Sequence, residues 1–595
     1  MNTQIDYINA GSDVRLVDGS GNSALRVVRD WNGSACRLAV VNQGAEAVCV
    51  KEVAAFIAKM PYPAETPFYG EGYNMLSQYE GTIESFGSIT RLTDAQHYKF
   101  PQTEGLSTVY NLLVLHPENE VVVLGFSSCR RFRGELRFNT ETIEIALCCE
   151  GIELGAGETL ELEEFFSAIG ADREELLAAF GQCIEANHPR LPVSEVPTGW
   201  CSWYCYGDSL KEQDIFDNLA AIQSNNAGLK FIQLDAGYQR MMGDWLTPHA
   251  NFPNGIQPLC QRIKETGFEP ALWVAPFIAE EKSELLRDHP EWFIQNDEGE
   301  PLCSADVSFG GWRWAPWYML DGTHPGAQDY LRHVFHTMRE EWHCRYFKLD
   351  ANMWGALPWG RRYDPQATSI DAYRAGMRAI REGAGDDAFI LGSNTPMWPS
   401  IGELHGMRVS NDVVRMWDTF QGRARESFHR SWQNEHLWLN DPDCLVLRNQ
   451  DSEIIAKVGA PLGHGEHLGE DEFSFHAAYI LACGGLVLVS ERMMDLNADH
   501  RNVIQRLLPP SGVAARFDDR DFRVGRIETD DGLLLCLLNW DDDPVTYEFP
   551  LASACDVSDF WTDEVLERGV TSISPLTLAP RSGRVLRCQN NEYNR

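Results

Sequence analysis

The sequence lacks the long apolar segments and the dense cysteine pattern of membrane proteins and small secreted proteins. No run of about 18 apolar residues occurs, so we expect no membrane-spanning helix. The N-terminus, MNTQIDYINAGSDVRLVDG, has no basic segment followed by an apolar one, so we expect no secretory signal. Only 16 cysteines occur among 595 residues, and none forms a CxxC pair. We therefore expect a cytoplasmic protein with reduced thiols.

Basic residues are also scarce. The chain has 50 Lys and Arg against 87 Asp and Glu, which gives a formal net charge of −37. A field of this sign repels phosphate groups, so nucleic acid and anionic membranes are excluded as expected partners. Hydrophobic residues make up 44% of the chain and charged residues 23%, which excludes a disordered chain.

Three regions differ in their residue patterns and predict three domains. Residues 1–190 carry short apolar runs between turn residues, such as CRLAVVN and VVVLGFSS, and favour antiparallel sheets packed as a sandwich. In residues 191–500, short apolar strands alternate with amphipathic helices. Residues 501–595 return to strand patterns, which favour a small β-sandwich. The proline-rich segment 189–197 is the expected linker.

The middle region predicts a (β/α)8 barrel, because it contains roughly eight strand–helix units in succession. An open, doubly wound parallel sheet is the alternative. It is disfavoured because no glycine-rich phosphate loop follows the first strand. In a barrel of this kind the active site lies at the carboxyl ends of the strands, so those ends are where catalytic residues are expected.

Ionisable residues end several of these predicted strands. In RYFKLD, Lys348 and Asp350 share one face, because alternate residues of a strand point the same way. In MRVSND, Arg408 and Asp412 share a face by the same rule. Asp235 ends a further strand, KFIQLD. Two carboxyl groups from different strands suit glycoside cleavage, in which one group attacks and the other donates a proton.

Aromatic residues accompany these strand ends. Trp200 lies on the first strand of the barrel and Trp273 on the third. Aromatic rings stack on the apolar faces of sugars, so both are candidate sugar contacts. Each residue alone has a plainer interpretation, since strand-end aspartates often cap helices and tryptophans often fill cores. The coincidence of four polar strand ends favours a catalytic site.

These motifs resemble those of glycoside hydrolase family 36, the α-galactosidases. TGWCSWY, QLDAGYQ, LWVAPF, YFKLDAN, FILGS, GMRVSND and LNDPDCLVLR occur in the family's order, over about residues 60–450. The resemblance implies an N-terminal β-supersandwich, a catalytic (β/α)8 barrel and a C-terminal β domain. It also implies a retaining exo-α-galactosidase that needs no metal or organic cofactor and takes an oligosaccharide or galactoside as substrate.

The resemblance assigns roles to single residues. Asp350 is the expected nucleophile and Asp412 the expected acid/base, with their carboxyl groups about 5–5.5 Å apart for direct attack. Tyr73, in GEGYN, would bring an aromatic ring from the N-terminal domain to an active-site region. The expected sugar contacts are Lys348 to hydroxyls, Arg408 near O2, Trp273 by stacking, and Asp235 at the hydroxyls of C4 and C6.

Two departures from the family leave the glycone open. Ala236 stands where the family has a second carboxylate, and Ser393 stands where the family often has Cys near the C2 substituent. The alternatives are a β-L-arabinopyranoside, a C6-modified galactoside or an α-N-acetylgalactosaminide as substrate, galactosyl transfer instead of hydrolysis, and a silent sugar-binding protein. His464 and His467 in GHGEH more simply belong to a solvated loop than to a metal site. Self-association is left open.

Overall fold

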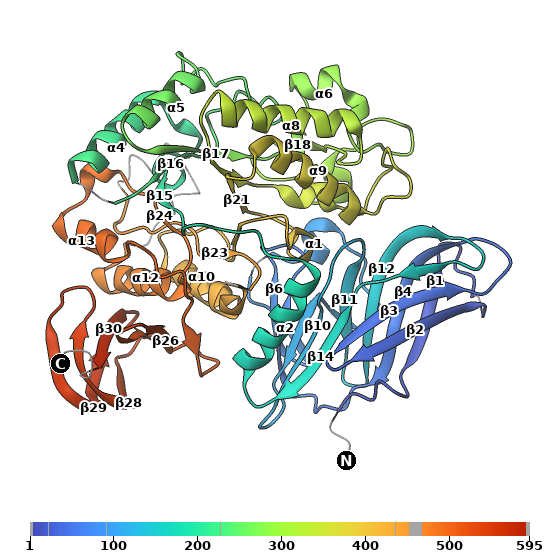
Figure 1. Cartoon of the computed structure of the whole chain (residues 1–595), viewed down its shortest axis with the longest axis horizontal. Helices are drawn as coiled ribbons and strands as arrows, with labels where there is room; N and C mark the ends of the chain where they lie inside the picture. The colour runs from blue at the N-terminus through green and yellow to red at the C-terminus, as the bar shows by residue number, and fades with distance from the viewer. Residues whose placement is uncertain are drawn as a thin grey trace.

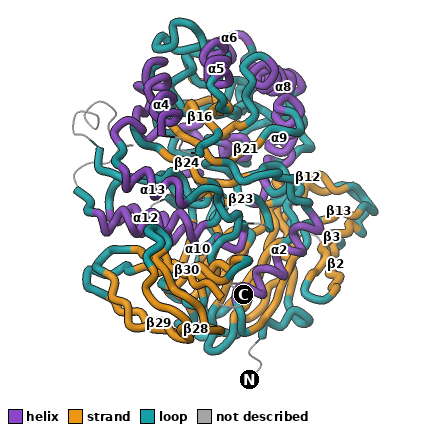
Figure 2. Tube along the Cα trace, turned by 60° about the vertical axis from the view of Figure 1, so that its left-hand side comes forward, coloured by secondary structure: helices purple, strands orange, loops and turns teal. Residues whose placement is uncertain are grey.

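The computed structural model describes residues 4–21, 23–90, 92–225, 228–434, 436–450 and 467–590. Figure 1 shows three parts: a pair of N-terminal sheets in blue, a central barrel in green to orange, and a C-terminal sheet in red. The two outer parts lie side by side against one side of the barrel. Figure 2 shows that most of the helices surround the barrel, whereas the two outer parts consist largely of strands.

The N-terminal domain is a sandwich of two antiparallel sheets. Its core contains Phe56, Phe126, Leu136 and Phe165, all fully buried. The first sheet has the order β1 (Gly11–Leu16), β4 (Val48–Lys59), β12 (Thr142–Leu154), β11 (Arg133–Phe138) and β8 (Ser107–Tyr110). The second sheet has the order β13 (Thr159–Glu161), β3 (Ala35–Asn42), β14 (Phe165–Gly170), β10 (Val121–Phe126), β9 (Leu112–Leu115), β5 (Pro67–Glu71), β6 (Gln78–Thr82) and β7 (Ser85–Ser88), with β2 (Leu25–Asn32) paired to β3.

The central domain is a parallel sheet of eight strands that closes almost completely, which confirms the predicted barrel. The strands follow the chain around the barrel: β15 (Thr198–Cys201), β16 (Phe231–Leu234), β17 (Glu269–Val274), β20 (Tyr346–Leu349), β21 (Phe389–Gly392), β22 (Gly406–Arg408), β23 (Leu439–Asp441) and β24 (Val487–Val489). The last strand pairs with the first, and the backbone N–H of Leu486 donates to the carbonyl of Asn440 beside the seventh. A two-stranded hairpin, β18 (Ile278–Glu280) and β19 (Trp317–Met319), follows the third strand.

Amphipathic helices cover the outside of the barrel. Apolar residues recur on one side of α8, where Leu331, Val334, Phe335 and Met338 are buried, as the helical period requires. The longer helices are α4 (Glu212–Asn225), α5 (Ile256–Glu265), α8 (Pro325–Glu340), α9 (Ser369–Ala384), α10 (Trp417–His429), α12 (Glu470–Cys483) and α13 (Ala498–Arg506).

One strand of the barrel is followed by a short 3-10 helix, η4 (Trp398–Ser400), and here the N-terminal domain packs. The indole of Trp398 donates to the carbonyl of Phe126 (2.7 Å) and stacks on Phe180 of α2 (Arg173–Asn187). Figure 1 shows α2 beside β10 and β14, on the side of the N-terminal sheets that faces the rest of the molecule. This contact fixes the N-terminal domain near the strand that ends at Ser393.

The C-terminal strands form one continuous antiparallel sheet with two buried faces. Its order is β25 (Arg516–Phe517), β26 (Val524–Thr529), β27 (Gly532–Leu538), β30 (Gly583–Asn590), β28 (Val545–Asp559) and β29 (Val565–Leu578). On β27, Cys536 and Leu538 belong to the core that includes α12, whereas Leu535 and Leu537 pack with Tyr547 on the other face. All 16 cysteines of the chain are free thiols. Within the described ranges, no helix is long and apolar enough to cross a membrane.

Candidate active site

The carboxyl ends of three barrel strands, β16, β20 and β22, bring the predicted ionisable residues together. Lys348 on β20 reaches across to Asp235 after β16, with 3.0 Å between Nζ and Oδ2, and both side chains are buried. Asp235 also accepts hydrogen bonds from Gln233 (2.8 Å) and from the backbone N–H of Ala236 (3.0 Å). Burial opposes the charge of the Lys348 ammonium, but Asp235, together with Cys201 and Asp443, outweighs that effect and holds the pKa of Lys348 well above its ordinary value.

Asp350 is held at the end of β20 by two donors. The indole N–H of Trp273, on the neighbouring strand, donates to Oδ2 (3.1 Å), and the backbone N–H of Ala351 donates to Oδ1 (2.6 Å). Ala351 has a φ of 52°, a left-handed conformation that turns the chain at this point and aims its N–H at the carboxylate. The carboxylate therefore has a defined orientation, and its residue keeps partial exposure.

Arg408 connects the predicted acid/base to a second, buried carboxylate. Its Nη2 lies 3.1 Å from Oδ1 of Asp412 and 3.1 Å from Oδ2 of Asp443. Asp443 also accepts from the hydroxyl of Tyr204 and from the backbone N–H of Val413 (2.7 Å). Arg408 and Asp443 are almost fully buried, whereas the Asp412 side chain is 62% exposed. Asp412 thus lies on the solvent-exposed side of the buried Arg408–Asp443 pair.

The surroundings of the two predicted catalytic carboxyls shift their pKa values in opposite directions. Burial and the charge of Asp412 raise the pKa of Asp350, although Lys348 opposes this change. For Asp412, desolvation by the surrounding protein disfavours the charged form, but the charges of Arg408 and Lys348 outweigh this effect and lower the pKa. The direct contact with the guanidinium accounts for this direction even though the side chain is largely exposed. In the free protein, the pKa of Asp350 is thus shifted up and that of Asp412 down.

Sequence reasoning missed two further carboxylates in this charged group. Asp441 ends β23, opposite Arg408, and Asp443 lies two residues later in a left-handed conformation. Burial and the neighbouring Asp443 raise the pKa of Asp441 to about 6. The motif LNDPD contained the signal, because both aspartates follow a short apolar segment of the type that ended at the other strand ends.

Trp200 corrects one prediction. It is fully buried, and its indole donates to the carbonyl of Glu491 (2.8 Å). The next residue, Cys201, points to Asp235 inside the barrel, with 3.6 Å between Sγ and Oδ2. Since neighbouring residues of a strand face opposite sides, Trp200 points away from the barrel interior. The predicted sugar contact by Trp200 is therefore wrong.

Tyr73 corrects a second prediction, although its loop does dock on the barrel. Residues Asn74 and Pro396 form an antiparallel bridge beside Ser393, which is buried after β21. The Tyr73 ring itself is fully buried against Phe100 and Tyr110 of its own domain. Its side chain therefore belongs to the domain core and does not line the barrel mouth.

Tyr98, on α1 (Asp94–Tyr98) of the N-terminal domain, contacts the barrel just after β21. Its hydroxyl donates to the amide oxygen of Asn394 (3.2 Å) and accepts from Asn74 (2.8 Å). Burial raises the pKa of this hydroxyl well above its ordinary value, and the charges of Asp94 and Asp350 add to that effect. No pattern in the sequence distinguishes Tyr98 from other aromatic residues.

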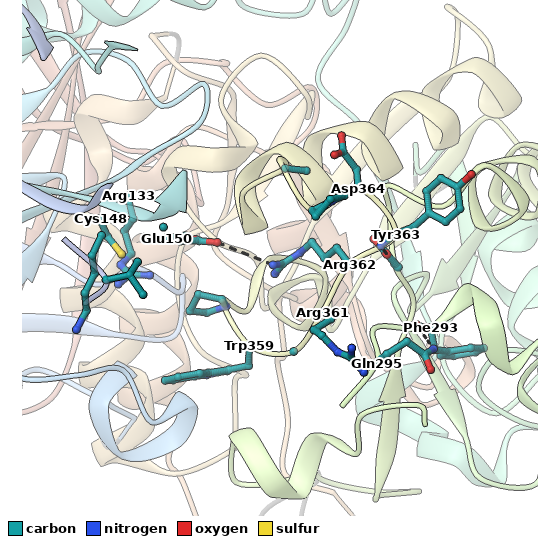
Figure 3. A pocket seen from close by; sticks show the side chains of 18 of the residues that line it. Arg133, Cys148, Glu150, Phe293, Gln295, Trp359, Arg361, Arg362, Tyr363 and Asp364 are labelled. Atoms are coloured by element: carbon teal, nitrogen blue, oxygen red, sulfur yellow. Dashed lines mark hydrogen bonds and ion pairs between the residues drawn. The ribbon is translucent and has the colours of Figure 1, made fainter. Parts of the chain in front are cut away.

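A cavity of about 890 Å³ lies apart from the predicted catalytic residues (Figure 3). It separates the first N-terminal sheet, with Arg133 and Glu150, from the loop that carries Trp359 and Arg362. Glu150 and Arg362 face each other across it, 3.9 Å apart. None of the predicted site residues lines this cavity, so its size does not identify it as the catalytic site. Among the described residues, no three His, Cys, Asp or Glu side chains form a metal-binding group; His464 lies outside these residues.

Comparison with known proteins supports the predicted class, a glycoside hydrolase. Residues 203–380 match the Melibiase family, so this part of the chain carries a melibiase-type domain. The probable alpha-galactosidase C of Aspergillus flavus is 24% identical over 287 residues, which cover 43% of this chain and 37% of that protein. The match thus spans little more than a third of that relative's length. Family 36 as distinct from family 27 stays a prediction.

Solved structures confirm the fold class. An alpha-galactosidase from Thermus thermophilus, in complex with p-nitrophenyl alpha-D-galactopyranoside, superposes with a TM-score of 0.62 at 22% identity. The alignment covers 84% of this chain and 97% of that one. The GH36 alpha-galactosidase AgaA from Geobacillus stearothermophilus superposes with a TM-score of 0.63 at 13% identity, covering 97% of this chain and 89% of the other. At these identities the likeness concerns the fold alone.

Proposed function

We propose that this chain is a retaining exo-α-galactosidase, which removes terminal α-D-galactosyl groups from oligosaccharides by double displacement. The observation that carries the proposal is the arrangement around Asp350. Its carboxylate is oriented by Trp273 and Ala351, next to the buried Lys348–Asp235 pair and within the influence of the Arg408–Asp412 pair. A core that needed only stability would not place so many carboxylates at one barrel mouth.

In the proposed reaction, Asp350 attacks the anomeric carbon, and Asp412 donates its proton to the oxygen of the departing group. The galactosyl group is then bonded to Asp350. Water enters, loses a proton to Asp412 and releases the sugar with retained configuration. The two hydrogen bonds to Asp350 hold the attacking oxygens in place, while Asp235 and Lys348 are positioned to bind the sugar hydroxyls.

The pKa shifts in the free protein run against the needs of the reaction, in which Asp350 must be ionised and Asp412 protonated, because the pKa of Asp350 is raised and that of Asp412 is lowered. Substrate binding offers a physical cause for the reversal. A bound sugar covers the exposed side of Asp412 and excludes water from it, which disfavours its charged form. The glycosidic oxygen also gives a protonated Asp412 a hydrogen-bond acceptor. The productive state is therefore formed in the complex.

The glycone is the finer part of this proposal. Ala236 is buried next to Asp235 and supplies only a backbone N–H where a second carboxylate would accept from a hydroxyl. A β-L-arabinopyranoside, which has no C6 hydroxyl, is the second candidate because it makes no demand on that position. The α-N-acetylgalactosaminide and galactosyl transfer are alternatives with less direct support from the site.

Hydrolysis of three nitrophenyl glycosides tests the proposal: the α-D-galactopyranoside, the β-L-arabinopyranoside and the α-N-acetylgalactosaminide. We expect the highest kcat/KM on the galactoside and release of the α-anomer first, observed by NMR. A preference for the arabinopyranoside would assign the reaction to the second candidate. Initial release of the β-anomer would contradict retention, and no turnover of any of the three would contradict the proposed class.

A further inference from the structure

Exposed aromatic rings gather on one segment at the carboxyl end of the barrel. Phe309 and Trp312 are 41% and 39% exposed, although large apolar side chains are usually buried. Their rings stack at 6.3 Å with an interplanar angle of 25°. Both rings contact Trp354, at 5.6 and 5.5 Å between centroids. We call the pair Phe309 and Trp312 the aromatic rim.

The contact with Trp354 ties the aromatic rim to the catalytic strand. Trp354 lies in the 3-10 helix η3 (Asn352–Ala356), which begins two residues after Asp350. Tyr98, whose pKa is raised in part by the charge of Asp350, packs against both Trp354 (5.5 Å) and Phe309 (6.0 Å). The rim therefore packs, through Trp354 and Tyr98, on the segment that directly follows the predicted nucleophile.

Two anchors fix the ends of this segment at the carboxyl end of the barrel. At one end, the backbone N–H of Phe309 donates to the carbonyl of His97 (2.7 Å) on the N-terminal domain. At the other end, Arg313 forms an ion pair with Asp208 (2.6 Å). Asp208 lies directly against Gly237, two residues after Asp235, because a side chain at 237 would come within 2.9 Å of the Asp208 backbone. The segment thus runs from the Asp350 side of the mouth to the Asp235 side.

The backbone of the segment is built for this crossing. Gly310 and Gly311 have φ values of 94° and 109°, which other residues rarely adopt. A β-carbon at Gly311 would lie 2.7 Å from the ring of Trp317, so only glycine allows the chain to pass this close. The hydroxyl of Ser304 accepts from the backbone N–H of Trp317 (3.0 Å) and donates to the carbonyl of Gly310 (2.6 Å), which holds the turn.

We propose that the aromatic rim binds the leaving group of the substrate, a second sugar ring or another ring with an apolar face. The proposal rests on the proposed glycosidase function. The galactosyl group needs charged partners for its hydroxyls, and these lie deep in the barrel at Asp235, Lys348 and Arg408. The rim is apolar and exposed at the carboxyl end of the barrel, the end at which the part of the substrate beyond the scissile bond must emerge. Stacking on exposed aromatic rings suits that part.

Substrates that share a glycone and differ in the leaving group test this site. Wild-type protein, Phe309→Ala and Trp312→Ala are compared on methyl α-D-galactopyranoside, whose leaving group is too small to reach the rim, and on raffinose. We expect each variant to lower kcat/KM on raffinose roughly tenfold, mainly through KM, and to leave the methyl galactoside within about twofold of wild type. Trp31→Ala is the matched control, because Trp31 is 38% exposed but lies on β2 of the N-terminal domain.

The outcomes separate this proposal from the one on which it rests. Equal losses on both substrates would assign the rim a structural role and overturn the proposal, as would unchanged kinetics on raffinose. A smaller particle mass of Trp312→Ala in light scattering would assign the rim to a contact between copies of the chain, and would also overturn it. If the wild-type protein turned over neither substrate, the proposed function itself would be wrong. If it turned over both, and the variants kept the wild-type ratio of kcat/KM on raffinose to kcat/KM on the methyl galactoside, only the proposal for the aromatic rim would be wrong.

Discussion

Two groups of buried charges in this molecule differ in how they are balanced. The first lies on the five-stranded sheet of the N-terminal domain, where Glu135 accepts from both Arg133 and Arg137, and Arg137 also contacts two further carboxylates. Three carboxylates face three guanidinium groups: Glu52, Glu135 and Glu144 with Arg15, Arg133 and Arg137. The pKa of Glu135 is lowered, because the arginines outweigh the cost of its burial.

The second group, at the barrel mouth, carries a surplus of acid. Its carboxylates are Asp235, Asp350, Asp412, Asp441 and Asp443, and the buried cations beside them, among the described residues, are Lys348 and Arg408. The consequence is visible in single groups, since the pKa of Asp441 rises to about 6 and that of Asp350 is also raised.

This difference separates a structural use of buried charge from a functional one. A balanced, closed network stabilises one arrangement and leaves nothing to titrate near neutral pH. A surplus of carboxylates is costly to fold and leaves groups able to exchange protons, which a glycosidase of the proposed kind requires. Substitutions in the two groups should therefore have opposite consequences for activity and stability.

The largest expected effect comes from Asp350→Ala, which removes the proposed nucleophile. We expect kcat to fall about 10⁴-fold, because no other group can take over the attack. The thermal unfolding curve should stay unchanged or shift slightly upward, since the variant relieves the surplus of negative charge. Nitrophenyl galactoside hydrolysis and calorimetry measure the two quantities. Substantial residual activity would place the nucleophile at another residue.

Asp412→Ala should have the next largest effect, and its size should depend on the leaving group. A poor leaving group needs the proton that Asp412 donates, so we expect a loss of about 10³-fold on methyl α-D-galactopyranoside. A nitrophenolate departs without that proton, so the loss on the nitrophenyl galactoside should be much smaller. Added azide should restore part of the activity by attacking the glycosyl-enzyme. Equal losses on both substrates would contradict the role of Asp412 as acid.

Glu135→Gln should show the opposite behaviour to Asp350→Ala. It removes the carboxylate partner of the buried Arg133, while Arg137 keeps Glu52 and Glu144, and we expect a loss of about 3 kcal/mol in the stability of the N-terminal domain. Activity per folded molecule should be unchanged, because this network does not reach the catalytic strands. Urea unfolding monitored alongside galactoside hydrolysis distinguishes the two. Lost activity without lost stability would erase the distinction between the two groups.

The sequence was sufficient to predict the architecture and the ionisable strand ends. Strand–helix alternation identifies a barrel, and the two-residue period of strands placed Lys348 and Arg408 on the inner face. The same rule could have excluded Trp200, but the alternation of a four-residue strand has no fixed starting point until a neighbour, here Cys201, is seen to face inward. The pairing of Lys348 with Asp235, rather than with Asp350, depends on how β20 and β16 face each other across the intervening β17.

Side chains on loops could not be placed from the sequence, because tertiary packing decides their direction. The loop around Tyr73 docks where expected, yet its ring enters the core and Tyr98 occupies the neighbourhood of Asp350 instead. Asp443 was present in a recognised motif, but its contact with Arg408 requires the left-handed turn that follows β23. The aromatic rim lies in an insertion after the third strand, which no barrel pattern predicts.

The smallest expected effect is a shift in pH dependence, and it tests the acid surplus directly. The Lys348 ammonium lowers the pKa of Asp350, so Lys348→Met should raise that pKa. Catalysis requires ionised Asp350, and the acid limb of kcat/KM reports its ionisation in the free protein. That limb should therefore move to higher pH, by about one unit, in addition to any loss of sugar binding. Arg131→Met, which removes a partly exposed cation paired to Asp371, is the control and should leave the limb in place. If the acid limb does not move in Lys348→Met, the neighbouring carboxylates rather than this cation set the pKa of Asp350. The two charged groups would then differ only in their ratio of carboxylates to cations.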